Sequence, residues 1–172
     1  KLAGLGFFAM RYPVDVGGLA LDLSTFCLAL AEIARGSMSL AGCAAMQALM
    51  GTKFLHLLGG ADIIERLLKP ALAGEKIGAI CMTEPDAGSD LGGITTTARK
   101  VDGGYVVSGK KIFASLSGAA DVYGVLCTLE RPGATLKDSL YLAVPADSQG
   151  VRIEGEWDPL GMRGTVSRTL IL

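Results

Sequence analysis

The sequence predicts an α+β protein in which an N-terminal α-helical segment is followed by an antiparallel β-domain of barrel or sandwich-like form. Up to residue 73 the apolar residues recur at helical spacing in three runs that end at glycines. From Glu75 onward they form short strand-like runs, and Asp102-Gly103-Gly104 is a strong hairpin signal between two of these runs. We therefore expect two domains, residues 1–74 and residues 75–172, with a hinge near Gly74.

Three helices are expected before the hinge. The first begins at an N-cap on Asp22 or Ser24. The second, residues 37–58, is apolar nearly all round, so it should lie at the centre of the helical cluster. The third covers residues 61–73 and should be distorted at Lys69-Pro70, because proline cannot donate a helical hydrogen bond.

Seven strands are expected after the hinge, because seven short apolar runs there are bounded by turn-forming residues. They are residues 77–83, 95–101, 105–108, 111–113, 122–129, 140–144 and 166–172. The last run stops at Leu172 without a turn or a polar tail, and the chain starts at Lys1 rather than at a methionine. We expect both ends to be cut.

Composition excludes several classes of partner. The formal net charge is -1 and no long run of Lys or Arg occurs, so neither nucleic acid nor a membrane is expected as a partner. Helix 37–58 is about as long as a membrane span, but Gln47, Lys53 and His56 argue against that reading. Half of the residues are apolar and only 19% are charged, so the chain carries apolar surface that a partner should cover.

The four cysteines indicate a reducing environment. They are scattered, with no CxxC pair and no Cys/His spacing, so no metal site and no disulfide framework are expected. A cytoplasmic location is the simplest prediction. His56 is the single histidine, and a lone helical histidine is more often packed or solvated than catalytic.

The segment Cys81 to Gly93 is the strongest candidate for a binding site. It follows a buried strand and is rich in glycine, so its backbone N–H groups can lie close to a ligand. Thr83, Ser89 and Asp90 add side-chain donors and acceptors, which suit a flat heteroaromatic or a phosphate-bearing ligand better than a metal. The alternative is an ordinary connection between a strand and a turn.

The order Cys81-Met82-Thr83-Glu84, two residues, Ala87-Gly88-Ser89-Asp90, two residues and glycine resembles the first signature of the acyl-CoA dehydrogenases. These flavoenzymes desaturate acyl-CoA thioesters between Cα and Cβ. A second segment, Phe113-Ala114-Ser115, is similar to a Trp-Ile-Thr-like segment that borders the flavin in that family. The resemblance implies FAD as the cofactor, and it covers nearly the whole chain.

The resemblance also implies roles for individual residues. Thr83 would reach the pyrimidine edge of the flavin, Phe113 would stack near the isoalloxazine, and Ser115 would donate near N5. Ser89 would contact both the cofactor and the acyl-CoA substrate. The complete set of cofactor-binding residues implied is Met82, Thr83, Gly88, Ser89, Phe113, Ala114 and Ser115. From the residues alone, Phe113 would instead be a core aromatic in a sheet.

The activity implied is FAD-dependent α,β-desaturation of an acyl-CoA, with hydride transfer to flavin N5 and electrons passing to an electron-transferring flavoprotein. A homo-oligomer, dimer or tetramer, is implied as well. Relatives carry the catalytic glutamate in a C-terminal helical domain, which is expected to be absent from this chain, so no catalytic residue is assigned and Glu84 is not promoted to that role. The alternatives are a flavin oxidase or monooxygenase on the same fold, and a non-catalytic acyl-CoA- or flavin-binding scaffold.

Two further segments match the family. Residues 158–165 resemble a Leu-Gly-x-Arg segment, in which Arg163 either supports the fold or is a surface cation. Residues 47–51 fall where relatives line the acyl pocket, whereas helical periodicity alone predicts that Met46 and Met50 belong to the core.

Overall fold

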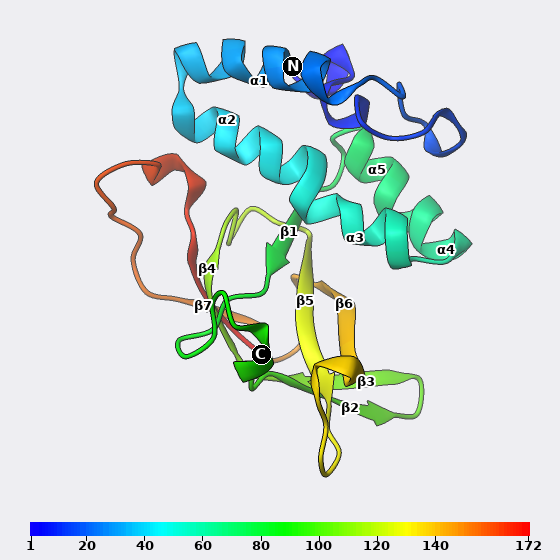
Figure 1. Ribbon diagram of the computed structural model, residues 1–172, viewed down its shortest axis with the longest axis vertical. Coiled ribbons are helices and arrows are strands. Elements are labelled where there is room, and N and C mark those ends of the chain that lie inside the picture. The colour runs from blue at the N-terminus through cyan, green and yellow to red at the C-terminus, as the bar shows by residue number, and fades with distance from the viewer.

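The computed structural model describes residues 1–172 and shows a layer of helices packed against two β-sheets (Figure 1). Helix α1 (Leu23–Gly36) begins at Asp22, whose carboxylate accepts a hydrogen bond from the Thr25 N–H at 2.8 Å. The predicted N-cap at Asp22 is therefore confirmed. No helix is both long enough and apolar enough to span a membrane.

The second predicted helix is continuous but contains a π-helical turn. Helix α2 (Met38–Ala45) leads into a π segment (Met46–Met50), which leads into α3 (Gly51–Leu58). This helix lies directly on β1, because a Cβ added at Gly51 would sit 2.0 Å from the Gly78 carbonyl oxygen. The predicted central position of the helix is confirmed by its contacts with α1 on one side and the sheet on the other (Figure 1).

The third helix runs through α4 (Ala61–Ile63), a π segment (Ile64–Leu68) and α5 (Lys69–Leu72). The Lys69 N–H donates to the Ile64 carbonyl, five residues earlier, in place of the usual i−4 partner. The predicted distortion at Lys69-Pro70 is thus observed as a π turn. The chain then leaves the helix at Gly74, whose φ of +74° favours glycine.

Strand β5 (Val122–Leu129) organises the larger sheet. It pairs in parallel with β1 (Gly78–Cys81) and β2 (Thr97–Val101), and antiparallel with β6 (Ser139–Pro145). Strand β3 (Gly104–Ser108) completes this sheet by pairing antiparallel with β2. The β-domain follows the helices as predicted. It was expected to be antiparallel throughout, but β5 pairs in parallel with both β1 and β2.

The smaller sheet contains β4 (Lys110–Ala114), β8 (Arg168–Ile171) and β7 (Arg152–Glu154) in the order β4-β8-β7, all antiparallel. All seven predicted strands are present, and β7 is additional. The two sheets stay separate and do not close into a barrel. The hairpin turn between β2 and β3 lies at Asp102-Gly103 as predicted, with Gly103 at a φ of +83°.

Two apolar clusters hold these layers together. One joins the sheets and contains Ala79, Cys81, Ala114, Ala120, Tyr123, Val125 and Leu170. The other joins the helices to β6 and contains Ala9, Tyr12, Val16, Phe54, Leu55, Leu68 and Leu72, with Tyr141 packed against it. The site described next lies where the helical layer meets both sheets.

Candidate functional site

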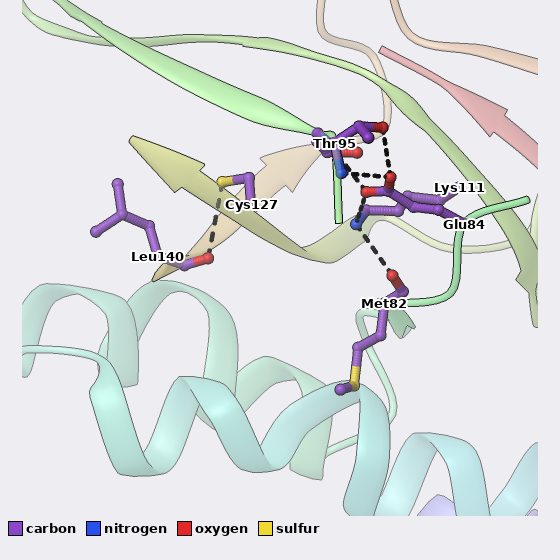
Figure 2. Close-up of polar contacts among 7 residues, drawn as sticks. Met82, Glu84, Thr95, Lys111, Cys127 and Leu140 are labelled. Carbon is purple, nitrogen blue, oxygen red and sulfur yellow. Dashed lines mark hydrogen bonds and ion pairs between the residues drawn. The ribbon is translucent and has the colours of Figure 1, made fainter. Parts of the chain in front are cut away.

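The segment after β1 is held in shape by Glu84. Its carboxylate accepts hydrogen bonds from the Thr95 N–H and hydroxyl, both at 2.7 Å, and from the Thr96 N–H at 3.0 Å. It also pairs with the Lys111 ammonium at 2.7 Å (Figure 2). One carboxylate therefore ties both ends of the segment 84–96 to strand β4.

This ion pair is almost completely shielded from water. The exposed fractions of the Lys111 and Glu84 side chains are 0% and 2%. Burial opposes ionisation of Glu84, but the hydrogen bonds from Lys111, Thr96 and Thr95 outweigh burial and lower its pKa from 4.5 to about 2. Glu84 is therefore an ionised structural anchor, and its low pKa and engaged oxygens make it a poor general base near neutral pH.

The same anchor brings the two predicted motifs together. The Lys111 ammonium also donates to the Met82 carbonyl at 3.0 Å, and the Ile112 N–H donates to the Thr83 carbonyl at 2.9 Å. The chain after β1 thus runs beside β4, where Lys111 contacts Met82 (Figure 2). The residue of β4 that follows Ile112 is Phe113. The hydrogen bond at Thr83 uses its carbonyl and leaves its hydroxyl available to a ligand.

Phe113 is placed as an exposed aromatic and not as a core residue. A bulge between Lys111 and Ala114 interrupts the pairing of β4 with β8, and Phe113 takes a φ of +55° there. Its side chain is 60% exposed and meets the Trp157 ring edge-on, with 6.2 Å between ring centroids. The alternative prediction of a core aromatic is wrong, because the bulge turns the ring out of the sheet.

The other predicted site residues differ in how far they are exposed to solvent. Met82, Thr83 and Ser115 are half-buried, whereas Gly88 and Ser89 are exposed. Ala114 is completely buried between the sheets and lies between the exposed Phe113 and the half-buried Ser115. The neighbouring Cys81 thiol is also buried, and burial raises its pKa to about 12, so it stays protonated and is not a nucleophile.

Ser115 is connected to a second turn that the sequence did not link to it. Its hydroxyl lies 2.7 Å from the Ser167 hydroxyl, which lies 2.9 Å from the Thr165 hydroxyl. The Leu116 N–H also donates to the Thr165 carbonyl at 2.8 Å. Hydroxyl residues two positions apart before a strand were the only signal for these contacts, and that pattern is common in sequences.

The turn at residues 162–166 also touches helix α2. The Gly164 N–H donates to the Ser39 hydroxyl at 3.2 Å, and the Cys43 thiol donates to the Gly164 carbonyl at 3.4 Å. Arg163 instead forms a 2.9 Å ion pair with Asp158 on the surface, where both side chains are mostly exposed. This arrangement makes Arg163 a surface cation with a local partner.

Gln47 joins the helical layer to the sheet and also lies in the wall of a small cavity. Its amide donates to the Ala71 carbonyl at 3.0 Å and the Lys76 carbonyl at 2.8 Å, and its oxygen accepts the Gly78 N–H at 2.8 Å. The amide of this buried side chain is therefore fully engaged across the expected hinge.

Met50 lies on the same π segment and is 51% exposed, so the prediction that it belongs to the core is wrong.

A small cavity lies between α2 and the β-domain. It has a volume of about 200 Å³ and is lined mainly by apolar residues, among them Phe8, Leu40, Cys43, Ala44, Ile77 and Leu116. Leu116 directly follows Ser115, so this cavity opens beside the second motif.

His56 lies away from this cavity. Its ring is edge-on to the Tyr12 ring, with 5.5 Å between the ring centroids, as expected for a packed histidine.

Comparison with known families gives two matches that follow each other along the chain. Residues 1–75 match the model of the acyl-CoA dehydrogenase N-terminal domain, and residues 79–172 match that of the acyl-CoA dehydrogenase middle domain. Among curated proteins, benzylmalonyl-CoA dehydrogenase of Aromatoleum aromaticum is 57% identical over 94% of this chain and 42% of its own length. The 3-(aryl)acrylate reductase of Clostridium sporogenes is 33% identical over 100% of this chain and 45% of its own length.

Among solved structures, an acyl-CoA dehydrogenase from Bacillus anthracis in complex with FAD is similar to this chain. The two superpose with a TM-score of 0.88 at 29% sequence identity, over 99% of this chain and 29% of the other. The chain thus spans less than half of the length of these relatives.

Proposed function

The chain belongs to the acyl-CoA dehydrogenase family, and we propose that it forms the part of an FAD-dependent enzyme that holds the flavin against an acyl-CoA thioester. The observation that carries this proposal is the hydrogen bond between Thr83 and Ile112, which sets the first motif beside Phe113 and Ser115. The remaining assignments of Met82, Gly88, Ser89 and Ala114 rest on the same arrangement.

The residues present fit a flavin. Phe113 offers an exposed aromatic face held outside the sheet, and the Thr83 hydroxyl is not used in the hydrogen bonds of its own loop. Gly88 is exposed, and no atom lies within 4 Å of where its Cβ would be, so the backbone there is open to close approach by a ligand. FAD would supply hydride acceptance at N5, and fixed donors such as Thr83 would stabilise charge on its pyrimidine side better than mobile water does.

We infer that the proton-abstracting base is supplied from outside these residues. Glu84 is the buried acid of the first motif, and its carboxylate is engaged by Thr95, Thr96 and Lys111. Its low pKa makes this carboxylate a weaker base than an ordinary glutamate. The chain's own contribution is to bind and orient the reacting groups.

An aromatic acyl group is the substrate class that we favour. The two curated relatives described above are named for benzylmalonyl-CoA and for arylacrylates. The cavity beside Leu116 is apolar, and its α2 wall carries small side chains at Cys43 and Ala44, which leave room for a ring. Apolar walls of this kind accept an aryl group more favourably than a charged or hydroxylated chain.

Partners and location follow from the same proposal. An electron-transferring flavoprotein would reoxidise the cofactor, and a homo-oligomer would cover exposed apolar side chains such as Leu28, Leu57 and Leu58, which are 71%, 65% and 68% exposed. A cytoplasmic location fits the four free cysteines.

The test uses the full-length protein that contains these residues, loaded with FAD under anaerobic conditions. Mixing with 3-phenylpropionyl-CoA should bleach the visible flavin band and form the enoyl product, and butyryl-CoA should react more slowly. Thr83→Val should weaken FAD binding, and Thr97→Val on β2 is the matched control outside the site. A protein that binds no FAD, or whose affinity is equal in both variants, would contradict the proposal. Rapid reaction of the reduced protein with oxygen would indicate an oxidase instead.

A further inference from the structure

Three hydroxyl groups form a continuous chain between the second motif and a backbone carbonyl. Ser115 contacts Ser167 at 2.7 Å, Ser167 contacts Thr165 at 2.9 Å, and the Thr165 hydroxyl contacts the Met162 carbonyl at 2.8 Å. Ser167 and Thr165 are buried, with 6% and 7% of their surface exposed, so water does not replace these contacts. The hydrogens of this chain can be assigned by counting donors.

The direction of the chain follows from its last member. A carbonyl cannot donate, so the Thr165 hydroxyl uses its only hydrogen on Met162. The hydrogen between Ser167 and Thr165 must then come from Ser167. Because Ser167 has no second hydrogen, the one between Ser115 and Ser167 comes from Ser115. The order of donation is therefore Ser115 to Ser167 to Thr165 to Met162.

The terminal carbonyl is fixed in place. Besides the Thr165 hydroxyl, it accepts the Thr165 N–H at 3.1 Å and the Trp157 indole N–H at 3.2 Å. Met162 itself has a φ of +58°, a left-handed conformation that this set of contacts holds. These contacts hold the carbonyl at the inner end of the hydroxyl chain, where it can only accept a hydrogen bond.

In this order of donation the Ser115 hydrogen points inward, toward Ser167. Only lone pairs of the Ser115 oxygen remain for a ligand, so Ser115 can accept a hydrogen bond from it but cannot donate one. N5 of an oxidised flavin accepts hydrogen bonds, whereas the N5–H of a reduced flavin donates them. We propose that Ser167 and Thr165 are positioning residues that make Ser115 a hydrogen-bond acceptor, so that the site favours reduced over oxidised FAD. This inference rests on the proposed function, and it reverses the donor role that the family resemblance implied for Ser115.

Donation from Ser115 to an oxidised flavin requires the chain to reverse. Ser167 would then donate to Ser115, Thr165 would donate to Ser167, and the hydrogen bond from the Thr165 hydroxyl to the Met162 carbonyl would be lost. The reversed chain makes one hydrogen bond fewer within the protein, which disfavours it. The order Ser115 to Ser167 to Thr165 to Met162 keeps every hydrogen bond of the chain. It also lets Ser115 bond to the ligand only when the ligand atom facing Ser115 is a donor.

The experiment measures the dissociation constants of oxidised and reduced FAD for the full-length FAD-binding protein and two variants. Ser167→Ala removes the inward acceptor of Ser115, and Thr165→Val frees the Ser167 hydrogen to point at Ser115. Both changes release Ser115 to donate outward, so the ratio of the oxidised to the reduced constant should fall ~3- to 10-fold, the equivalent of one ordinary hydrogen bond. A tenfold fall lowers the two-electron reduction potential by ~30 mV.

Controls separate this effect from a structural one. Thr165→Ser keeps the hydroxyl and should restore the native ratio. Ser39→Ala removes a hydroxyl of α2 that contacts the same turn, at Gly164, but does not belong to the chain. Thermal unfolding reports whether each variant folds. Equal weakening of both redox forms, or an unchanged ratio in Ser167→Ala and Thr165→Val, would overturn the inference while leaving the proposed function intact.

A second measurement is independent of FAD. Neutron diffraction from deuterated crystals of the protein locates the deuterons on Ser115 and Ser167. We expect the Ser115 deuteron to lie on the line to Ser167, and a deuteron directed away from Ser167 would refute the assigned polarity. A protein that binds no FAD would contradict the proposed function and its redox consequence, and the neutron result would still decide the direction of the chain.

Discussion

Glu84 holds the candidate site in shape through its hydrogen bonds with Thr95 and Thr96 and its ion pair with Lys111. Its folded-state pKa of about 2 lies below its ordinary value of 4.5, so the ionised form stabilises the fold. This stabilisation is fully present above pH ~4.5 and is lost as the pH falls through 4.5 toward 2. At 1.36 kcal/mol per pKa unit, the difference corresponds to about 3 kcal/mol.

The first prediction is that Glu84→Gln removes this acid-dependent stability. At pH 7 the variant leaves the Lys111 ammonium buried without a counter-charge, which should lower the free energy of unfolding by about 3–5 kcal/mol. Between pH 4.5 and 2 its unfolding midpoint in urea should fall less steeply than that of the native chain.

Asp62→Asn is the matched control for the Glu84 experiment, because it breaks an ion pair with Arg66 whose side chains are 69% and 74% exposed. That change should alter stability by less than about 1 kcal/mol. Equal effects of the two substitutions at neutral pH would mean that the buried pair does not anchor the segment.

Phe113 gives the second prediction, which concerns backbone strain. A non-glycine residue in the left-handed region is destabilised by ~1–2 kcal/mol, and this ring is 60% exposed, so little burial offsets that strain. Phe113→Gly should therefore be more stable than Phe113→Ala by about 1 kcal/mol, the reverse of the usual order. Both variants should lose FAD affinity. Urea unfolding and flavin titration check the two parts, and an Ala variant more stable than the Gly variant would show that the strain is absent.

At this scale the sequence indicated which residues belong to the candidate site better than it indicated which side chains are buried or paired. Thr83, Phe113 and Ser115 were predicted as site residues from the resemblance to the family motifs, and the structure brings their segments together. The Glu84–Lys111 pair was not foreseen, because Lys111 lies in a strand pattern next to Lys110 and nothing local distinguishes a buried lysine from an exposed one. Its burial depends on a carboxylate 27 residues away in the chain.

At the scale of elements, the contact between the central helix and β1 gives the third prediction. Alanine is a better helix former than glycine by ~1 kcal/mol, yet a Cβ at Gly51 would lie 2.0 Å from the Gly78 carbonyl oxygen. Gly51→Ala should therefore destabilise the protein by at least about 1–3 kcal/mol, because overpacking outweighs propensity. Gly36→Ala is the control, since no atom lies within 4 Å of its Cβ position at the end of α1. Urea unfolding compares the two, and stabilisation by both changes would argue against close packing at Gly51.

Element types and order were predictable from the sequence, whereas strand pairing was not, except for the hairpin of β2 and β3. Periodicity identified the long helices, and turn residues bounded the strands. Strand β7 was missed because its three residues, Arg152–Glu154, carry too short a pattern to recognise. The parallel pairing of β5 with β1 and β2 depends on contacts between distant segments, which local patterns do not encode. The π turn at Met46–Met50 was missed for a related reason, since Gln47 meets its partners only in the folded chain.

At the scale of the whole molecule, the helical layer and the β-domain are joined by specific contacts. Gln47 binds the Ala71 and Lys76 carbonyls on either side of Gly74, and Gly164 is held by Ser39 and Cys43 of α2. The boundary between residues 1–74 and 75–172 stays a prediction, but these contacts argue against a freely moving hinge. The geometry at Ser115 thus depends on both parts of the chain.

The last prediction concerns turnover by these 172 residues alone. The Glu84 carboxylate is engaged by Lys111, Thr95 and Thr96, so we expect it not to abstract a thioester α-proton. Removing a general base typically lowers a rate by about 10²–10⁴-fold. Anaerobic mixing of the FAD-loaded chain with 3-phenylpropionyl-CoA should therefore leave the flavin band unbleached over seconds, while dithionite should still reduce it. Bleaching together with enoyl-CoA formation in both the native chain and Glu84→Gln would place a base within these residues at another position.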